Sequence, residues 1–189
     1  HCAGNPLRGP NDIVFDQQGG FWFTDHGKNR PRDKDRTGVY YASIDGQQIK
    51  EVIFPLEAPN GIGLSPDEAT LYVAETPTGR VWAFDIKAPG ELGGSRRMLA
   101  QLPDYHMFDS LAVDSAGNVC VATLITGGIT VHSADGATAR LIDMPDILTT
   151  NICFGGDNLQ TAFITLSATG KLVSMPWHCP GLPLNFLNR

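Results

Sequence analysis

The chain has 189 residues, of which 42% are hydrophobic, a formal net charge of −6 and an isoelectric point of about 5.2. This length suits a single domain with a core of ordinary size. The acidic balance and the absence of a Lys/Arg-rich run argue against a nucleic-acid or anionic-membrane partner. No apolar run approaches the roughly 18 residues that a membrane helix needs.

Four segments of the chain share one pattern. Each begins with Asn or Asp, continues with a short apolar run, passes through a turn rich in Asp, Gly, Ser or Pro, and ends with a second apolar run. The segments are NDIVFDQQGGFWFTD, NGIGLSPDEATLYVAET, DSLAVDSAGNVCVATL and NICFGGDNLQTAFITLS, which start at Asn11, Asn60, Asp109 and Asn151. Two runs of Val, Ile, Phe, Tyr and Trp around such a turn predict a β-hairpin.

Further apolar runs between the hairpins predict two more strands in each unit. They lie at residues 38–44 and 48–54, 79–86 and 97–102, and 127–133 and 138–144. The hairpins start 49, 49 and 42 residues apart. Four strands at such a period, without a sustained helical pattern, are the signature of a β-propeller. We therefore predict an all-β chain with one propeller domain, in blades at about 7–56, 57–103, 104–146 and 147–189, the last with ragged outer strands and a Pro-rich tail.

The cysteines are Cys2, Cys120, Cys153 and Cys179. None forms a CxxC pair, and none stands at the usual zinc-ligand spacing from a histidine. The apolar surroundings of Cys120 and Cys153 predict buried free thiols, which favours a reducing, cytoplasmic location. Because the chain begins with His1 and not Met, we expect its true N-terminus to be missing.

The residues that begin the four repeats should converge. Inner strands of propeller blades start near one mouth of the central channel, so Asn11, Asn60, Asp109 and Asn151 should gather there. Amide and carboxylate oxygens in a ring suit a hard divalent cation such as Ca²⁺, Mg²⁺ or Mn²⁺. The alternative is that these residues only form turns, because Asn and Asp readily bond their own main chain.

The motifs PND and PNG, with FDSLAVDSAGN downstream, resemble the SMP-30/gluconolactonase/luciferin-regenerating enzyme family over residues 7–177. The resemblance implies a six-bladed propeller, of which about four blades are present, with one divalent metal at the channel mouth. It implies hydrolysis of a small-molecule lactone, most simply a sugar lactone such as gluconolactone. Ca²⁺ is the expected ion, with Mg²⁺, Mn²⁺ or Zn²⁺ as alternatives.

Carried over by position, the resemblance makes Asn60 and Asp109 metal ligands and Asp109 also the catalytic acid/base. It places Asn11 and Asp12 where substrate binds, and it ranks Asn151 lower. The family also uses a metal-binding Glu upstream of PND, so we expect one or two preceding blades, with that Glu, to be missing from this chain.

Two histidines are further candidates for substrate binding. His26 opens a long charged loop, and loops of this kind cover propeller mouths. His106 stands three residues before Asp109. The competing interpretations are a non-catalytic propeller that binds a sugar or peptide, and a truncated inactive homologue. No GxSxG, GxGxxG or P-loop motif supports another enzyme class.

Overall fold

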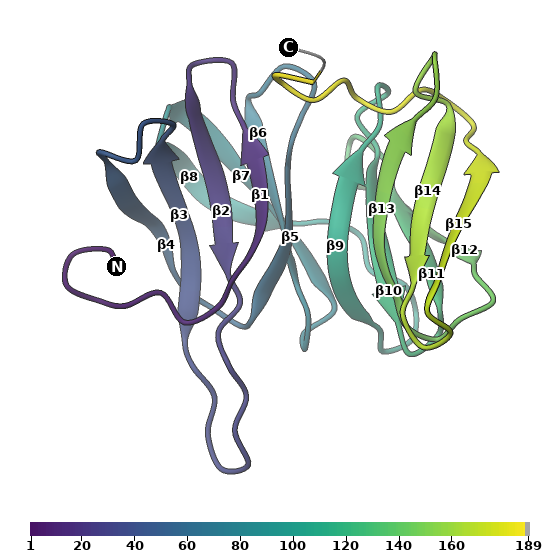
Figure 1. The fold of residues 1–189 in the computed structure, drawn as a ribbon, viewed down its shortest axis with the longest axis horizontal. Coiled ribbons are helices and arrows are strands. Elements are labelled where there is room, and N and C mark those ends of the chain that lie inside the picture. The colour runs from purple at the N-terminus through teal and green to yellow at the C-terminus, as the bar shows by residue number, and fades with distance from the viewer. Residues whose placement is uncertain (188–189) are drawn as a thin grey trace.

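The structure, a computed structural model, describes residues 1–187, which form antiparallel sheets joined by loops (Figure 1). The first sheet contains β1 (Pro10–Phe15), β2 (Gly20–Asp25), β3 (Thr37–Ser43) and β4 (Ile49–Leu56). The second contains β5 (Pro59–Leu64), β6 (Thr70–Glu75), β7 (Arg80–Ala88) and β8 (Glu91–Met98). The third contains β9 (Met107–Val113), β10 (Val119–Leu124), β11 (Gly128–His132) and β12 (Ala139–Asp143). The fourth contains β13 (Thr149–Gly155), β14 (Thr161–Leu166) and β15 (Lys171–Pro176).

Each sheet is a meander in which strands that follow one another in the sequence pair antiparallel. The sheets stand side by side in an arc, with β1, β5, β9 and β13 along its inner side (Figure 1). This is the blade arrangement of a β-propeller, so the predicted fold class is confirmed. Within the described residues, no helix is long and apolar enough to span a bilayer.

The turns between the first two strands of the first and third sheets are built by acidic side chains. Asp16 Oδ1 accepts hydrogen bonds from the backbone N–H groups of Gln18 (2.9 Å) and Gly20 (3.0 Å). Asp114 Oδ1 accepts in the same way from Ala116 (3.0 Å) and Asn118 (2.9 Å). An Asp that satisfies two turn donors fixes the hairpin locally. This is why the turn motif was readable in the sequence.

Apolar faces of neighbouring sheets pack against each other in three layers. Trp22, which is 1% exposed, packs with Leu71 and Val73 between the first two sheets. Phe108 lies between the second and third sheets. Trp177 closes the layer between the third and fourth sheets. Alternate residues of each strand supply these layers, as a period of two requires.

Two expectations from the sequence were wrong in detail. The strand expected at 97–102 is replaced by β8, which lies earlier in the chain and ends at Met98. It starts early because Pro89 and Gly90 make a tight turn directly after β7. Gly90 has φ +67°, a conformation that favours glycine. The last unit, in which ragged outer strands were expected, has three paired strands in the described part of the chain, and its Pro-rich tail runs irregularly. Cys153 is exposed on β13, although all four cysteines are free as predicted.

Candidate active site

The inner strand of every sheet carries a register shift where the repeat begins. The shifts fall between Pro10 and Ile13, between Pro59 and Ile62, between Phe108 and Leu111, and between Thr149 and Asn151. Extra residues at such a β-bulge turn side chains away from the regular alternation. The inner strands run in the same direction, so the bulges lie together at one end of the channel (Figure 1). This bulged end of the channel is called the mouth.

Asn60 is the most buried of the predicted mouth residues, with 4% of its surface exposed. Its side-chain Nδ2 donates to Thr76 Oγ1 over 3.2 Å. Its Oδ1 atom is buried and has no hydrogen-bond partner. A buried carbonyl oxygen without a donor is costly, and such atoms are few in native structures, so each needs an explanation. The Oδ1 atom therefore marks a position suited to a ligand.

Asp109 lies against Asn60 although the two residues belong to different sheets. Burial raises the pKa of the Asp109 carboxyl above its ordinary value, and hydrogen bonds from the Asn60 side chain and the Ser110 N–H partly oppose this. A carboxyl with a raised pKa binds a proton more readily near neutral pH, as a general acid/base must. The structure thus brings together the two residues predicted to share one site.

Asp12 is the second carboxyl of the mouth. Its Oδ1 accepts from the Ile13 N–H (2.9 Å) and its Oδ2 from the Ile62 N–H (3.2 Å), which joins β1 to β5. Burial, with a smaller contribution from the nearby charge of Asp109, raises the pKa of Asp12 to about 6 although the two backbone hydrogen bonds oppose it. The charge of Asp109 thus makes ionisation of Asp12 more costly, and two carboxyls this close concentrate negative charge where a cation would be stabilised.

Substitution of Asp12 tests this electrostatic environment. A carboxyl whose pKa is raised from 3.8 to about 6 binds protons more tightly in the folded state, so the stability of the protein falls as pH rises through that window. Asp12→Asn removes this dependence. In metal-free buffer, we expect the variant to gain about 2 kcal/mol relative to the unmodified chain between pH 4 and pH 7, measured by urea unfolding. An identical stability difference at both pH values would contradict the assignment.

Thr24 was not recognised in the sequence as part of this site. Its side chain is fully buried, and its Oγ1 accepts from the Asp12 N–H (3.1 Å) and donates to the Asn60 backbone carbonyl (2.7 Å). It therefore holds the two bulges of β1 and β5 in a fixed relation. The available signal was a polar residue inside the apolar strand GFWFTD.

The two histidines occupy different surroundings at this end. Burial lowers the pKa of His26, which lies beside the Pro59 backbone at the start of β5, and its Nδ1 is buried without a hydrogen-bond partner. His106 is 8% exposed, and its Nδ1 lies 2.9 Å from Thr126 Oγ1 in the loop after β10. His26 thus lies next to the Asn60 bulge, whereas the ring of His106 is held by its own sheet.

Asn11 and Asn151 are both exposed. Asn151 and Asp12 line a channel of about 550 Å³ between the inner strands, and residues 182–187 line it as well. No hydrogen bond joins Asn11 or Asn151 to Asn60 or Asp109 within residues 1–187. Asn151 therefore lines the channel, whereas Asn11 lines a separate hollow with Phe21 and Phe23, and neither completes the Asn60–Asp109 pair.

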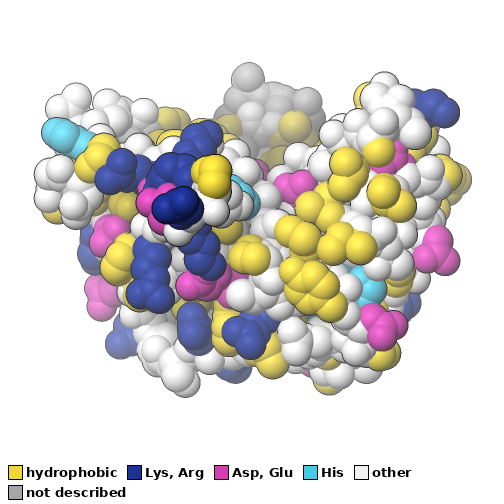
Figure 2. Space-filling view, turned by 90° about the horizontal axis from the view of Figure 1, so that it is seen from below, with side chains coloured by type: hydrophobic (Ala, Val, Ile, Leu, Met, Phe, Trp, Pro, Cys, Tyr) yellow, Lys and Arg dark blue, Asp and Glu magenta, His cyan; other side chains and the backbone are white. Residues whose placement is uncertain are grey.

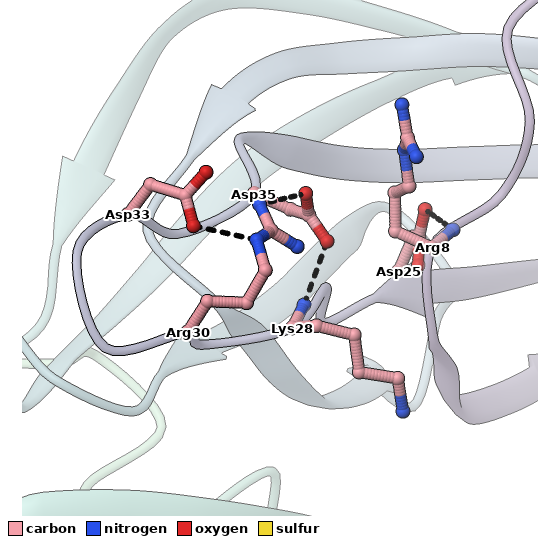
Figure 3. A network of polar contacts seen from close by, with 6 residues as sticks. All are labelled: Arg8, Asp25, Lys28, Arg30, Asp33 and Asp35. Carbon is pink, nitrogen blue, oxygen red and sulfur yellow. Dashed lines mark hydrogen bonds and ion pairs between the residues drawn. The ribbon is translucent and has the colours of Figure 1, made fainter.

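A charged loop, residues 26–36, projects from the first sheet on the mouth side (Figure 1). Arg30 pairs with Asp33 and, over 2.8 Å, with Asp35, whose carboxylate also accepts from the Lys28 N–H (Figure 3). Seen from this side, Lys and Arg side chains gather on one half of the molecule and hydrophobic side chains on the other (Figure 2). The mouth therefore has a structured, polar rim on one side.

The oxygen donors at the mouth fit a hard divalent cation. Asn60 offers an unpaired amide oxygen, and Asp109 offers a half-buried carboxylate beside it. Glu57 and Glu75 do not add to this set, since Glu75 accepts the Glu57 N–H (2.8 Å) and Glu57 pairs with Lys34. Two protein oxygens at the mouth would leave most coordination positions of such an ion to other groups.

Sheets in an arc with a polar, bulged channel mouth define this protein as a β-propeller with a candidate site at one end of its channel. A profile of the SMP-30/Gluconolactonase/LRE-like region matches residues 1–168. The chain therefore belongs to the SMP-30/gluconolactonase/LRE-like family, which confirms the resemblance noted in its sequence.

Individual relatives agree with this family. Lactonase drp35 of Staphylococcus saprophyticus is 37% identical over 71% of the chain and 42% of its own length. Diisopropyl-fluorophosphatase of Loligo vulgaris is 29% identical over 94% of the chain and 60% of its own length. The structure of a gluconolactonase from Xanthomonas campestris superposes with a TM-score of 0.78 at 32% identity, over 93% of this chain and 59% of that one. The chain thus spans about half the length of the proteins it matches.

Proposed function

We propose that the protein takes part in the hydrolysis of a lactone, with a sugar lactone such as gluconolactone as the simplest substrate, at the Asn60–Asp109 mouth. The observation that carries the proposal is the buried, unpaired Oδ1 of Asn60 next to the Asp109 carboxyl. Relatives named as lactonases and a gluconolactonase fold support the substrate class.

In this proposal Asn60 Oδ1 and an Asp109 oxygen hold one divalent cation, with Ca²⁺ as the preferred ion. A bound cation of this kind supplies Lewis acidity, which polarises a carbonyl oxygen. Asn60 is positioned for this by Thr24, which bonds its backbone, and by Thr76, which fixes its amide. Asp12 adds negative charge close by, and Asn11, His26 and His106 are the proposed contacts for the hydroxyl groups of the substrate.

Asp109 carries the proton in the proposed reaction. A water molecule attacks the lactone carbonyl carbon while the Asp109 carboxylate takes a proton from that water. The bond between this carbon and the ring oxygen then breaks, and Asp109 returns the proton to the departing oxygen. The product is the open hydroxy acid, and Asp109 ends as it began. Burial raises the pKa of Asp109 toward the working pH, so the side chain can both accept the proton from water and give it to the leaving oxygen.

The dependence on a cation is tested by chelation. We expect treatment with EDTA to lower the rate of gluconolactone hydrolysis at least about 100-fold, because the polarising charge is lost, and added Ca²⁺ to restore it. Asn60→Ala should weaken Ca²⁺ binding in isothermal titration calorimetry. Asn158→Ala, at an exposed turn of the fourth sheet, is the matched control and should bind as the unmodified chain does.

Two results would contradict the proposal. One is hydrolysis that continues unchanged after EDTA treatment. The other is Ca²⁺ binding that Asn60→Ala and Asn158→Ala affect equally. A phosphofluoridate ester measured in parallel separates the substrate classes, because one relative is a diisopropyl-fluorophosphatase. Turnover of the phosphorus ester without turnover of any lactone would replace the lactone in the proposal.

A further inference from the structure

A second cluster of possible metal ligands lies at the other end of the third sheet. Asp114 follows β9 directly, and His178 and Cys179 follow β15. One ligand atom from each of these residues lies within 4.8 Å of the other two. Asp114 is fully buried, Cys179 is half-buried and His178 is exposed, so the cluster opens toward solvent on one side.

We propose that Asp114, His178 and Cys179 form a zinc site that ties the C-terminal segment to the third sheet. His178 Nε2 lies 3.5 Å from Asp114 Oδ2. That separation is longer than an ordinary N–H···O hydrogen bond, which spans about 2.7–3.2 Å. It is close to the separation of two ligands that each lie about 2.0–2.1 Å from one tetrahedral zinc ion, roughly 3.3 Å. A carboxylate, an imidazole and a thiolate are a zinc-type donor set, with the fourth position open to water.

The turn that contains Asp114 holds its Oδ2 atom in a fixed position as a possible ligand. Asp114 Oδ1 is taken up by the Ala116 and Asn118 N–H groups, whereas Oδ2 accepts from Asn118 Nδ2 over 2.8 Å and faces His178. A hydrogen bond of this kind from a neighbouring side chain orients a metal ligand and holds its geometry. The equivalent Asp16 of the first sheet builds the same turn but faces Tyr41 instead. The His–Cys pair is therefore a feature added to this one turn.

The proposed site lies where the C-terminal segment, residues 178–187, leaves the fourth sheet and crosses back toward the first (Figure 1). The segment is held by the Ser115 N–H to Pro180 carbonyl bond (2.9 Å) and the Leu182 N–H to Val113 carbonyl bond (3.0 Å). Farther on, Asn185 Nδ2 donates to the Phe15 carbonyl over 2.9 Å. Zinc at the start of this segment would fix it across the channel end opposite the mouth.

This site is separate from the mouth. Asp109 and Asp114 are five residues apart along β9 and its end, which corresponds to roughly 16 Å in a strand. It was also missed in the sequence, because adjacent His178 and Cys179 do not have the spacing of a zinc finger and their third partner is 64 residues away. Only the crossing of the C-terminal segment over the third sheet brings the three together.

The proposal is tested by metal titration of the EDTA-treated, reduced protein. We expect Co²⁺, as a spectroscopic substitute for zinc, to give a thiolate charge-transfer absorption that one equivalent of Zn²⁺ abolishes. Cys179→Ser should remove this absorption, and both Cys179→Ser and His178→Ala should weaken Zn²⁺ binding about 100-fold or more. Cys153→Ser, which removes an exposed thiol on the fourth sheet, is the matched control and should leave both readouts unchanged.

The outcomes separate this site from the mouth. Asp109→Asn should leave the Co²⁺ absorption intact, so failure of the proposed hydrolysis does not affect the zinc proposal. Absence of a thiolate absorption in the unmodified protein would overturn the zinc site. So would an absorption that persists in Cys179→Ser, or one that is lost in Cys153→Ser, because each would assign the metal to a different thiol.

Discussion

Asp109→Asn is expected to lower kcat/KM for lactone hydrolysis by a factor of about 10² to 10⁴, the usual contribution of a positioned general acid/base. The amide has the shape of the carboxyl but cannot take a proton from water. It also removes the charge that would hold a cation beside Asn60. The measurement is a steady-state assay with gluconolactone in the presence of excess Ca²⁺.

The same substitution should not weaken the fold. Burial raises the pKa of Asp109, so its ionised form is a cost to the folded state at neutral pH. Asn has no such cost, and we expect Asp109→Asn to unfold in urea at the same or a slightly higher concentration than the unmodified chain. Loss of activity together with unchanged stability is the pattern of a residue that serves the reaction and not the structure.

Asp104→Asn is the matched control, since Asp104 is an exposed carboxylate in the loop that leads into β9. It changes the net charge by the same amount and should keep full activity. If Asp109→Asn retains more than about a third of the activity while folded, Asp109 is not the proton carrier. Equal losses in both variants would instead indicate a general effect of charge on the substrate.

The sheets were predictable because their signals are local. Asp16 and Asp114 satisfy turn donors two and four residues away, and the flanking strands alternate over a few residues. The strand predicted at 97–102 was wrong because a turn earlier in the chain starts the strand sooner than the apolar pattern indicates. The Pro89–Gly90 turn makes the chain reverse directly after β7, so the polar, glycine-containing residues of β8 pair with β7. The more apolar residues that follow β8 lie outside the strand.

The sequence predicted the site only because residues at equivalent positions of the repeats should lie close together in a propeller. Repeat spacing indicated that Asn60 and Asp109 would approach one another, and the structure places them in contact. The bulges could not be predicted, because a register shift depends on how two strands pair. The unpaired Oδ1 of Asn60 and the bridging role of Thr24 depend on burial by a neighbouring sheet, which no local pattern encodes.

Gly61→Ala is expected to be the most damaging single substitution near the site. A Cβ atom at residue 61 would lie 2.5 Å from the Leu111 backbone nitrogen and 2.8 Å from the Asp109 backbone oxygen. These are main-chain atoms, so no side chain can move aside, and β5 must separate from β9. We expect the free energy of unfolding, measured in urea, to fall by about 2–4 kcal/mol, at or above the usual cost of overpacking.

Gly170→Ala separates this steric effect from the ordinary cost of replacing a glycine. Gly170 has φ +63° and open space around its Cα, so its replacement should cost only the roughly 1–2 kcal/mol of a left-handed residue. If Gly61→Ala costs no more than Gly170→Ala, β5 and β9 do not pack as closely as described. Where Gly61→Ala remains folded, separation of the strands should also move Asn60 from Asp109. Ca²⁺ affinity should then fall in Gly61→Ala and stay unchanged in Gly170→Ala, which links the glycine of the PNG motif to the asparagine beside it.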